Sequence, residues 1–355
     1  MVTFLAEYGL FVAKALTVVV AALVVFGTIF ASSVRGRKEP GGQIKVRQLN
    51  EQLEEVQRTI KEAVLPKEQI KEAQKAEKKQ KKQQHKADKK ALKKSAKDDK
   101  PSEESKKRVY VLDFDGDVKA SAVESLRKEI TAVLSMARPV DEVVLRLESP
   151  GGMVHSYGLA SSQLERIKNK GIPLTICVDK VAASGGYMMA CIADQIVAAP
   201  FAILGSIGVI AQLPNFHRLL KKNDIDFEMF TAGEYKRTVT TMGENTDKGR
   251  EKFKEELEDT HVLFKEFVGS QRSKVDIDKV ATGEHWYGTR AKELDLVDEL
   301  KTSDEYLVDA CDDADVYEVE YKQKPSMADR FGLGIEDVSE RLMLKAYRLF
   351  EGKFF

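Results

Sequence analysis

The sequence predicts an α/β fold with a mainly parallel β-sheet between Arg108 and about Leu300. Two observations predict this fold. Short apolar runs rich in β-branched residues recur along the stretch, and amphipathic segments with a helical period separate them. Strands that are joined through helices form right-handed crossovers, and such crossovers build a parallel sheet with helices on both faces.

The first elements follow directly from these patterns. Strands are predicted at 109–114, 143–147 and 174–178, and helices at 123–136, at 159–167 and from near Ser184. Residues 187–213 are apolar enough to suggest a membrane span, but Asp194 and Pro200 interrupt them. A strand–turn–strand inside a core is therefore the better prediction for that segment.

Less regular elements complete the predicted domain. The run 227–233 predicts a further strand, which leads to Lys236. Residues 248–268 predict a long charged helix with one apolar side. The aromatic residues of 285–291 are expected to pack against the core just before another helix.

A membrane anchor is predicted near the amino terminus. Residues 15–34 are twenty uncharged residues, long enough to cross a hydrocarbon core of about 30 Å. The alternative, a cleavable signal peptide, usually has a shorter apolar region and a basic lead, and here Lys14 is the only basic residue ahead of the run. The prediction is a single-pass protein of a bacterial inner membrane. Arg35, Arg37 and Lys38 would place the following portion in the cytoplasm.

A charged linker follows the predicted anchor. Apolar residues at helical spacing predict a helix over 49–64, which Pro66 would end. Residues 67–100 are almost wholly Lys, Gln, Glu, Asp and Ala, a composition that cannot form a core. No aromatic residue accompanies the lysines, so nucleic acid is not expected as a partner. Weak attraction to anionic lipid is the alternative to a plain linker.

The composition argues against a disulfide framework and against metal or cofactor sites. The formal net charge of the 355 residues is zero, which favours neither an acidic nor a basic partner. Three cysteines are too few for a disulfide framework, and Cys177 and Cys191 lie in apolar segments as expected for buried thiols. No zinc-binding spacing, EF-hand or phosphate-binding loop is present, so no metal and no cofactor are predicted.

Three positions suggest a catalytic site. Ser184 follows a predicted strand and precedes two glycines, as an exposed nucleophile on a strand-to-helix turn does, although a helix N-cap is the alternative. Gly151 and Gly152 follow another strand and could turn their N–H groups toward an oxyanion. Lys236 follows the run 227–233, which is predicted to be a strand. Open α/β sheets gather ligand sites at such strand ends.

Four sequence blocks carry a family resemblance. They are Ser-Pro-Gly-Gly at 149–152, Ala-Ala-Ser-Gly-Gly-Tyr at 182–187, Gly-Ser-Ile-Gly-Val-Ile at 205–210 and Gly-Glu-Tyr-Lys-Arg-Thr at 233–238. Together and in this order they resemble the signal peptide peptidase A family, serine peptidases of family S49. The resemblance covers about 108–300. One departure is Glu148, where many relatives have Asp; it precedes the donor loop, outside the reacting groups.

The resemblance implies a Clp-protease/crotonase-like fold and a serine endopeptidase with a Ser-Lys dyad. Ser184 would be the nucleophile, Lys236 the general base and Ser206 the residue that orients the lysine amine. Gly151 and Gly152 would form the oxyanion hole. It also implies a homo-oligomeric ring and peptide substrates such as signal-peptide remnants or membrane-protein fragments. The better-known members of the family work on the periplasmic side of the membrane. This conflicts with the cytoplasmic location that Arg35, Arg37 and Lys38 predict.

Alternatives remain at this stage. His155, close to the glycine loop, is a second candidate for the base, but no carboxylate partner is suggested for it. A lysine, with a reference pKa near 10.4, must be buried to act as a base at neutral pH. An acyl-CoA enzyme of crotonase type could use the same glycine loop, and a non-catalytic membrane scaffold would use the anchor.

The predicted division of the chain has four parts. They are an anchor at 1–38, a helical or disordered Lys-rich linker at 39–107, a catalytic domain at 108–302 and a carboxyl-terminal extension at 303–355 that contacts a neighbouring subunit or the membrane.

Overall fold

The computed structural model describes residues 9–11, 14, 16–18, 41–66, 68–70 and 106–323. Within these ranges no helix is both long and apolar enough to span a membrane. The predicted anchor at 15–34 lies outside the described residues except for 16–18, and the tail from 327 lies wholly outside them. The chain divides into two compact units, and the site belongs to the unit from Ile44 to Tyr321.

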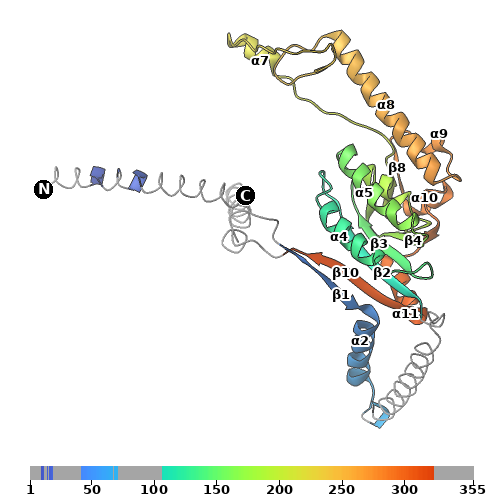
Figure 1. Cartoon of the computed structure of the whole chain (residues 1–355). Coiled ribbons are helices and arrows are strands. Elements are labelled where there is room, and N and C mark those ends of the chain that lie inside the picture. Colours follow the sequence, from blue (N-terminus) through green and yellow to red (C-terminus); the bar gives the residue numbers. More distant parts are fainter. Residues whose placement is uncertain are drawn as a thin grey trace, which may run out of the picture. The chain divides into compact units, whose positions relative to one another are not determined.

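A seven-stranded sheet forms the centre of this unit, in the order β1-β10-β2-β3-β4-β6-β9 (Figure 1). Every adjacent pair from β10 to β9 is parallel, which confirms the predicted mainly parallel sheet. The strands are β1 Gln43–Gln48, β2 Arg108–Asp115, β3 Glu142–Glu148, β4 Leu174–Val178, β6 Gln195–Ala198, β9 Glu299–Leu300 and β10 Asp315–Lys322.

Helices cover both faces of the sheet, so its central strands are apolar on both sides. Successive residues of a strand point to opposite faces. Leu112, Leu145 and Ile176 belong to the larger core cluster, and Val111 and Val144 to a smaller cluster on the other face. The larger cluster includes residues of α4 Val123–Leu134, α5 Val154–Lys168, α6 Gly185–Ala190 and α8 Asp247–Gln271; the smaller includes α11 Ser303–Asp313 and the start of α2 Leu49–Val64.

A second, three-stranded sheet carries the site. It contains β5 Val181–Ala183, β7 Ile203–Gly205 and β8 His285–Tyr287, with β5 and β7 parallel and β8 antiparallel to β7. A bridge between Ser149 and Ala182 ties it to the end of β3. Of the aromatic residues predicted to pack against the core in this block, Trp286 does so, whereas Tyr287 is exposed. The remaining helices are α7 His217–Lys222, α9 Ile277–Val280 and α10 Gly288–Glu293.

Two expectations need correction. Residues 227–233 form no strand; they are irregular and exposed, because no neighbouring strand pairs with them. Helix α5 begins at Val154, ahead of the predicted 159. The four-part division of the chain stays a prediction; the sheet of the folded unit includes β1 and β10, which lie on either side of 108–302. The helix predicted over 49–64 is α2, with the same bounds.

Candidate active site

Ser184 occupies a strained turn between β5 and α6. Its φ of 51° is a conformation that costs a residue other than glycine about 1–3 kcal/mol. Its N–H donates to the carbonyl of Gly205 at 2.8 Å, which holds the turn in place. Ser184 is the N-cap residue of α6, but its side chain makes no capping hydrogen bond to the helix. The half-buried hydroxyl is left free to face the adjoining cavity.

The sequence after Ser184 permits this turn because glycine has no Cβ. A Cβ on Gly185 would lie 2.4 Å from the ring of Tyr157, and one on Gly186 would lie 2.5 Å from the carbonyl oxygen of Ser149. Both contacts are far shorter than any real Cβ contact. The two glycines therefore allow α6 to begin directly against α5 and the end of β3.

A chain of hydrogen bonds fixes the loop after β3. The N–H of Gly151 donates to Ser149 Oγ at 3.1 Å, and the Ser149 and Tyr157 hydroxyls lie 2.6 Å apart. Tyr157 donates its proton to the carbonyl of Asp117 at 2.8 Å, so Ser149 must donate to Tyr157. Burial raises the pKa of Tyr157, and the hydrogen bond with Ser149 opposes this rise. The Tyr157 hydroxyl therefore stays protonated and can donate to Asp117.

Two backbone N–H groups next to Ser184 remain free. Within the described part of the chain, the N–H groups of Gly152 and Gly185 donate to no acceptor. Gly185 opens α6, and the first N–H groups of a helix have no partner inside it. Both residues line the same cavity as Ser184. The N–H of Gly151 is already used by Ser149, and its φ of 91° shapes the turn.

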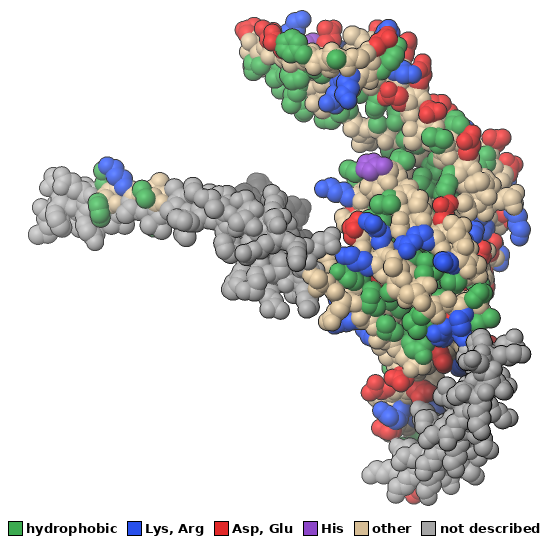
Figure 2. Space-filling model, viewed as in Figure 1, with side chains coloured by type: hydrophobic (Ala, Val, Ile, Leu, Met, Phe, Trp, Pro, Cys, Tyr) green, Lys and Arg blue, Asp and Glu red, His purple; other side chains and the backbone are tan. Residues whose placement is uncertain are grey.

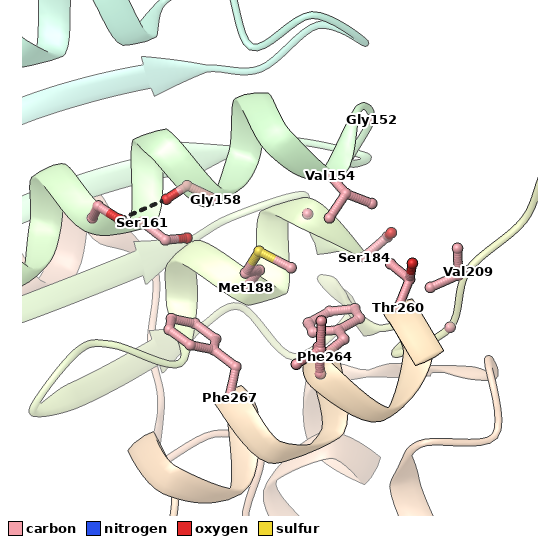
Figure 3. Close-up of a pocket in the computed structure, with 14 residues that line it drawn as sticks. Gly152, Val154, Gly158, Ser161, Ser184, Met188, Val209, Thr260, Phe264 and Phe267 are labelled. Carbon is pink, nitrogen blue, oxygen red and sulfur yellow. Dashed lines mark hydrogen bonds between the residues drawn. The ribbon is translucent and has the colours of Figure 1, made fainter. Parts of the chain in front are cut away.

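A cavity of about 370 Å³ opens beside Ser184 (Figure 3). Its walls come from α5, α6, α8 and the segment after β7, and most of them are apolar. The lining residues are Gly152, Val154, Gly158, Ser161, Ser162, Ser184, Gly185, Met188, Gly208, Val209, Thr260, Leu263, Phe264 and Phe267. A cavity of this size and lining suits an apolar side chain of a substrate.

Ser206 lies close to Ser184 through the backbone of β7. It follows Gly205, whose carbonyl accepts the N–H of Ser184. The N–H of Ser206 donates to the carbonyl of Glu284 at 2.7 Å, and its φ is 51°. His261 on α8 contacts the next carbonyl, that of Ile207, at 3.2 Å. These contacts fix the segment that ends at the cavity wall.

Lys236 is not brought to Ser184 within one chain. It lies in the irregular segment that carries α7, it is exposed, and it is absent from the cavity lining. Its N–H closes a turn to the carbonyl of Gly233 at 3.2 Å. The same segment exposes large apolar side chains, among them Ile210 at 79% and Phe230 at 89%. Figure 2 shows hydrophobic side chains in green on the surface of the part that carries α7.

Other predicted features are placed as follows. His155 is exposed in the first turn of α5 and does not line the cavity. Glu148 is also outside the cavity and pairs with Lys180 at 2.8 Å. Cys177 and Cys191 are buried free thiols, as predicted. In the part of the chain that the structure describes, no cluster of His, Cys, Asp or Glu is suited to a metal ion.

Some residues of the site were not identified from the sequence. The free N–H of Gly185 could have been identified, because the residue after a predicted nucleophile on a strand-to-helix turn is the first residue of a helix. The role of Tyr157 and the cavity walls supplied by Phe264 and Phe267 could not, because no sequence pattern shows that α5 contacts the loop after β3 or that α8 reaches this cavity.

Comparison with known proteins identifies the family. Residues 3–164 match "Peptidase family S49 N-terminal", and residues 166–317 match "Peptidase family S49". The chain belongs to peptidase family S49. The S49 resemblance of the four sequence blocks is thereby confirmed, and the chain is a member of a family of peptidases.

Relatives of this S49 peptidase carry protease names. "Probable protease SohB" of Haemophilus influenzae is 52% identical over 94% of this chain and 93% of its own length. "Probable protease SohB" of Buchnera aphidicola subsp. Acyrthosiphon pisum is 52% identical over 68% of this chain and 72% of its own. Among solved structures, a mutant of the 1510-N membrane-bound stomatin-specific protease with a substrate peptide covers 66% of this chain and 99% of its own, at 14% identity and a TM-score of 0.40.

Proposed function

We propose that the protein is a membrane-anchored serine endopeptidase in which Ser184 and Lys236 form a catalytic dyad. The observation that carries the proposal is the strained turn at Ser184. The hydroxyl of this serine makes no capping hydrogen bond and lies beside an apolar cavity and two free N–H groups. Nucleophile turns of hydrolases combine these features. The fold would be of the Clp-protease/crotonase type, preceded by one membrane helix at 15–34.

The proposed reaction follows from these groups. Neutral Lys236 removes the proton of the Ser184 hydroxyl, and the serine oxygen attacks the substrate carbonyl. The N–H groups of Gly152 and Gly185 stabilise the oxyanion, while Gly151 and Ser149 shape the loop. The lysine then returns its proton to the leaving amine, and water releases the acyl group from Ser184. Ser206 would orient the lysine amine.

Lys236 must reach Ser184 for this reaction, and burial must disfavour its charged form. Two routes would achieve both. Its own segment could fold down over the cavity, or a second copy of the chain could supply the lysine in an oligomeric ring. The exposed apolar side chains of the segment support either route, because they would be buried in both.

The dyad is tested with Ser184→Ala and Lys236→Ala in the detergent-solubilised full chain. Each substitution should abolish peptide hydrolysis, and the double variant should be no worse, because either loss disables the same step. Circular dichroism must show that both variants are folded. Mixing the two variants should restore activity only if the lysine comes from another copy. Substantial activity in Lys236→Ala would contradict the base assignment, and His155→Ala would be the next variant.

The pH dependence separates a lysine base from a histidine base. Only the neutral amine accepts the serine proton, so activity should rise as the pH increases through the pKa of the catalytic amine. The kcat/KM profile should therefore still rise above neutrality. A rise complete by about pH 6, near or below the histidine reference of about 6.5, together with inactivity of His155→Ala, would exclude the lysine mechanism.

The proposed location is the bacterial inner membrane, with signal-peptide remnants or membrane-protein fragments as substrates. The full chain should remain in membranes after carbonate washing and keep an uncleaved amino terminus. Release by salt alone would indicate attachment through the Lys-rich linker instead. A mature amino terminus near Ser32 or Ser33 would indicate a signal peptide.

A further inference from the structure

One wall of the cavity beside Ser184 contains a polar group without a partner. Ser161, on α5, is only 1% exposed, and its hydroxyl oxygen is buried without a hydrogen-bond partner. Ser161 lines the cavity, across from Phe264 and Phe267 of α8 and near Met188 of α6 (Figure 3). An unpaired buried hydroxyl is unfavourable, so Ser161 gains from any ligand atom that can pair with it.

The neighbouring residue shows that this situation is particular to Ser161. Ser162 is the same residue type on the same helix and also lines the cavity, but it is exposed and its hydroxyl donates to the carbonyl of Gly158 at 3.0 Å. Ser161 makes no such bond to its own helix. A ligand in the cavity can pair with this hydroxyl only if a change of χ1 turns it from its buried position toward the cavity.

The remaining walls indicate what carries the matching polar group. Phe264 and Phe267 offer aromatic faces, and the Met188 thioether makes favourable contacts with aromatic rings. A cavity of about 370 Å³ accommodates an aromatic side chain. A phenol both donates and accepts a hydrogen bond, so it can pair with a serine hydroxyl in either direction.

We infer that Ser161 is a specificity-determining residue that selects tyrosine on the acyl side of the scissile bond. The ring of the tyrosine lies between α6 and α8, and its hydroxyl pairs with Ser161. This inference rests on the proposed hydrolysis at Ser184, because the cavity opens beside that residue. A site with a buried polar group discriminates against an otherwise similar ligand that leaves the group unpaired.

The test compares peptides that differ only in this side chain: tyrosine, 4-methylphenylalanine and phenylalanine. The methyl group has nearly the size of the hydroxyl but forms no hydrogen bond. In the full chain, kcat/KM for tyrosine should exceed that for 4-methylphenylalanine by about tenfold. Ser161→Ala should reduce the ratio to about one. The control Ser156→Ala, on the same helix but outside the cavity lining, should leave it unchanged.

Two results would overturn the inference: a ratio near one in the unsubstituted chain, or a tenfold ratio that persists in Ser161→Ala. A binding measurement distinguishes failure of this inference from failure of the proposed function. If no peptide is cleaved, N-acetyltyrosine and N-acetyl-4-methylphenylalanine are titrated into the full chain by calorimetry. Tighter binding of the tyrosine compound that is lost in Ser161→Ala supports the inference without hydrolysis, and equal binding rejects it.

Discussion

At the residue scale, the donor loop depends on the hydroxyl of Tyr157, which lies outside every recognised sequence block. That hydroxyl accepts from Ser149 and donates to the carbonyl of Asp117, and Ser149 in turn accepts from Gly151. The loop that carries Gly152 is therefore positioned from α5. A small displacement of such donors lowers catalysis more than it lowers substrate binding.

Tyr157→Phe should consequently reduce kcat about tenfold with little change in KM, since the oxyanion donors would be less well positioned. The free energy of unfolding should fall by about 1–3 kcal/mol, because Ser149 and Asp117 lose a buried partner. Tyr306→Phe is the control: it removes bonds to Glu142 and Thr175 on the other face of the sheet. An unchanged kcat in Tyr157→Phe would show that the network serves stability alone.

Glu129 is a buried carboxyl that opposes folding when it is ionised. One carboxylate oxygen accepts the N–H of Tyr321 at 2.7 Å, and the other has no partner. Burial raises the pKa of Glu129 from 4.5 to about 7; the bond from Tyr321 opposes this rise, and Asp113 and Glu320 add to it. Between these values the folded state holds a proton that the unfolded state has lost.

Stability should therefore fall as the pH rises from about 4.5 to about 7, by up to roughly 3 kcal/mol. Glu129→Gln keeps an acceptor for Tyr321 and removes the charge. The variant should match the unsubstituted chain near pH 4.5 and exceed it in unfolding free energy at pH 8, measured by urea denaturation. A constant difference between the two proteins across this range would contradict the assignment.

At the element scale, α5 combines a structural role with the shaping of the cavity. Gly158 lies within the helix and lines the cavity, and a Cβ at this position would meet nothing within 4 Å. Glycine inside a helix is less stable than alanine by about 0.5–1 kcal/mol. The glycine thus leaves room in the cavity at the expense of helix stability.

Gly158→Ala should raise the free energy of unfolding by about 0.5–1 kcal/mol. Gly158→Leu should fill part of the cavity and lower kcat/KM about tenfold or more for peptides with a large acyl-side residue, but not for alanine. Gly171→Ala is the comparison: its surroundings are equally open, yet its φ of 69° should make alanine destabilising. Equal kcat/KM losses for large and small residues in Gly158→Leu would show that the cavity does not bind this side chain.

At the scale of the whole molecule, the folded unit extends on both sides of residues 108–300, the stretch in which the sequence blocks indicated the resemblance. Strand β10 pairs with β2 through the register Val316 to Val109, and β1 lies beyond it at the edge of the sheet. Val316 is fully buried in the smaller core cluster with Leu307 of α11. Removal of β10 would expose this cluster and the edge of β2.

A fragment of residues 41–323 should consequently fold, with a cooperative thermal transition in circular dichroism. The fragment 41–302, cut at the boundary predicted from sequence, should aggregate or lack that transition. A fragment of residues 106–323 lacks the edge strand β1 and helix α2, so it should fold with reduced stability. Cooperative folding of 41–302 would contradict the role assigned to β10.

The central elements could be predicted because their patterns are local. The run 174–178 became β4 with the same bounds, and the period of apolar residues in 49–64 became α2. The strand at 227–233 was wrong although its composition is typical of a strand, because a strand forms only where a neighbour completes its hydrogen bonds. Local propensity cannot show whether that neighbour exists.

The sequence by itself determined the parallel α/β sheet, the family and the turn that presents Ser184, because apolar period, motif order and small residues around a serine are properties of neighbouring positions. Only the tertiary structure decided that α8 closes the cavity beside Ser184, that Ser161 lacks a partner and that Lys236 does not line that cavity. These facts depend on which distant segments meet, and packing between such segments leaves no regular period in the sequence.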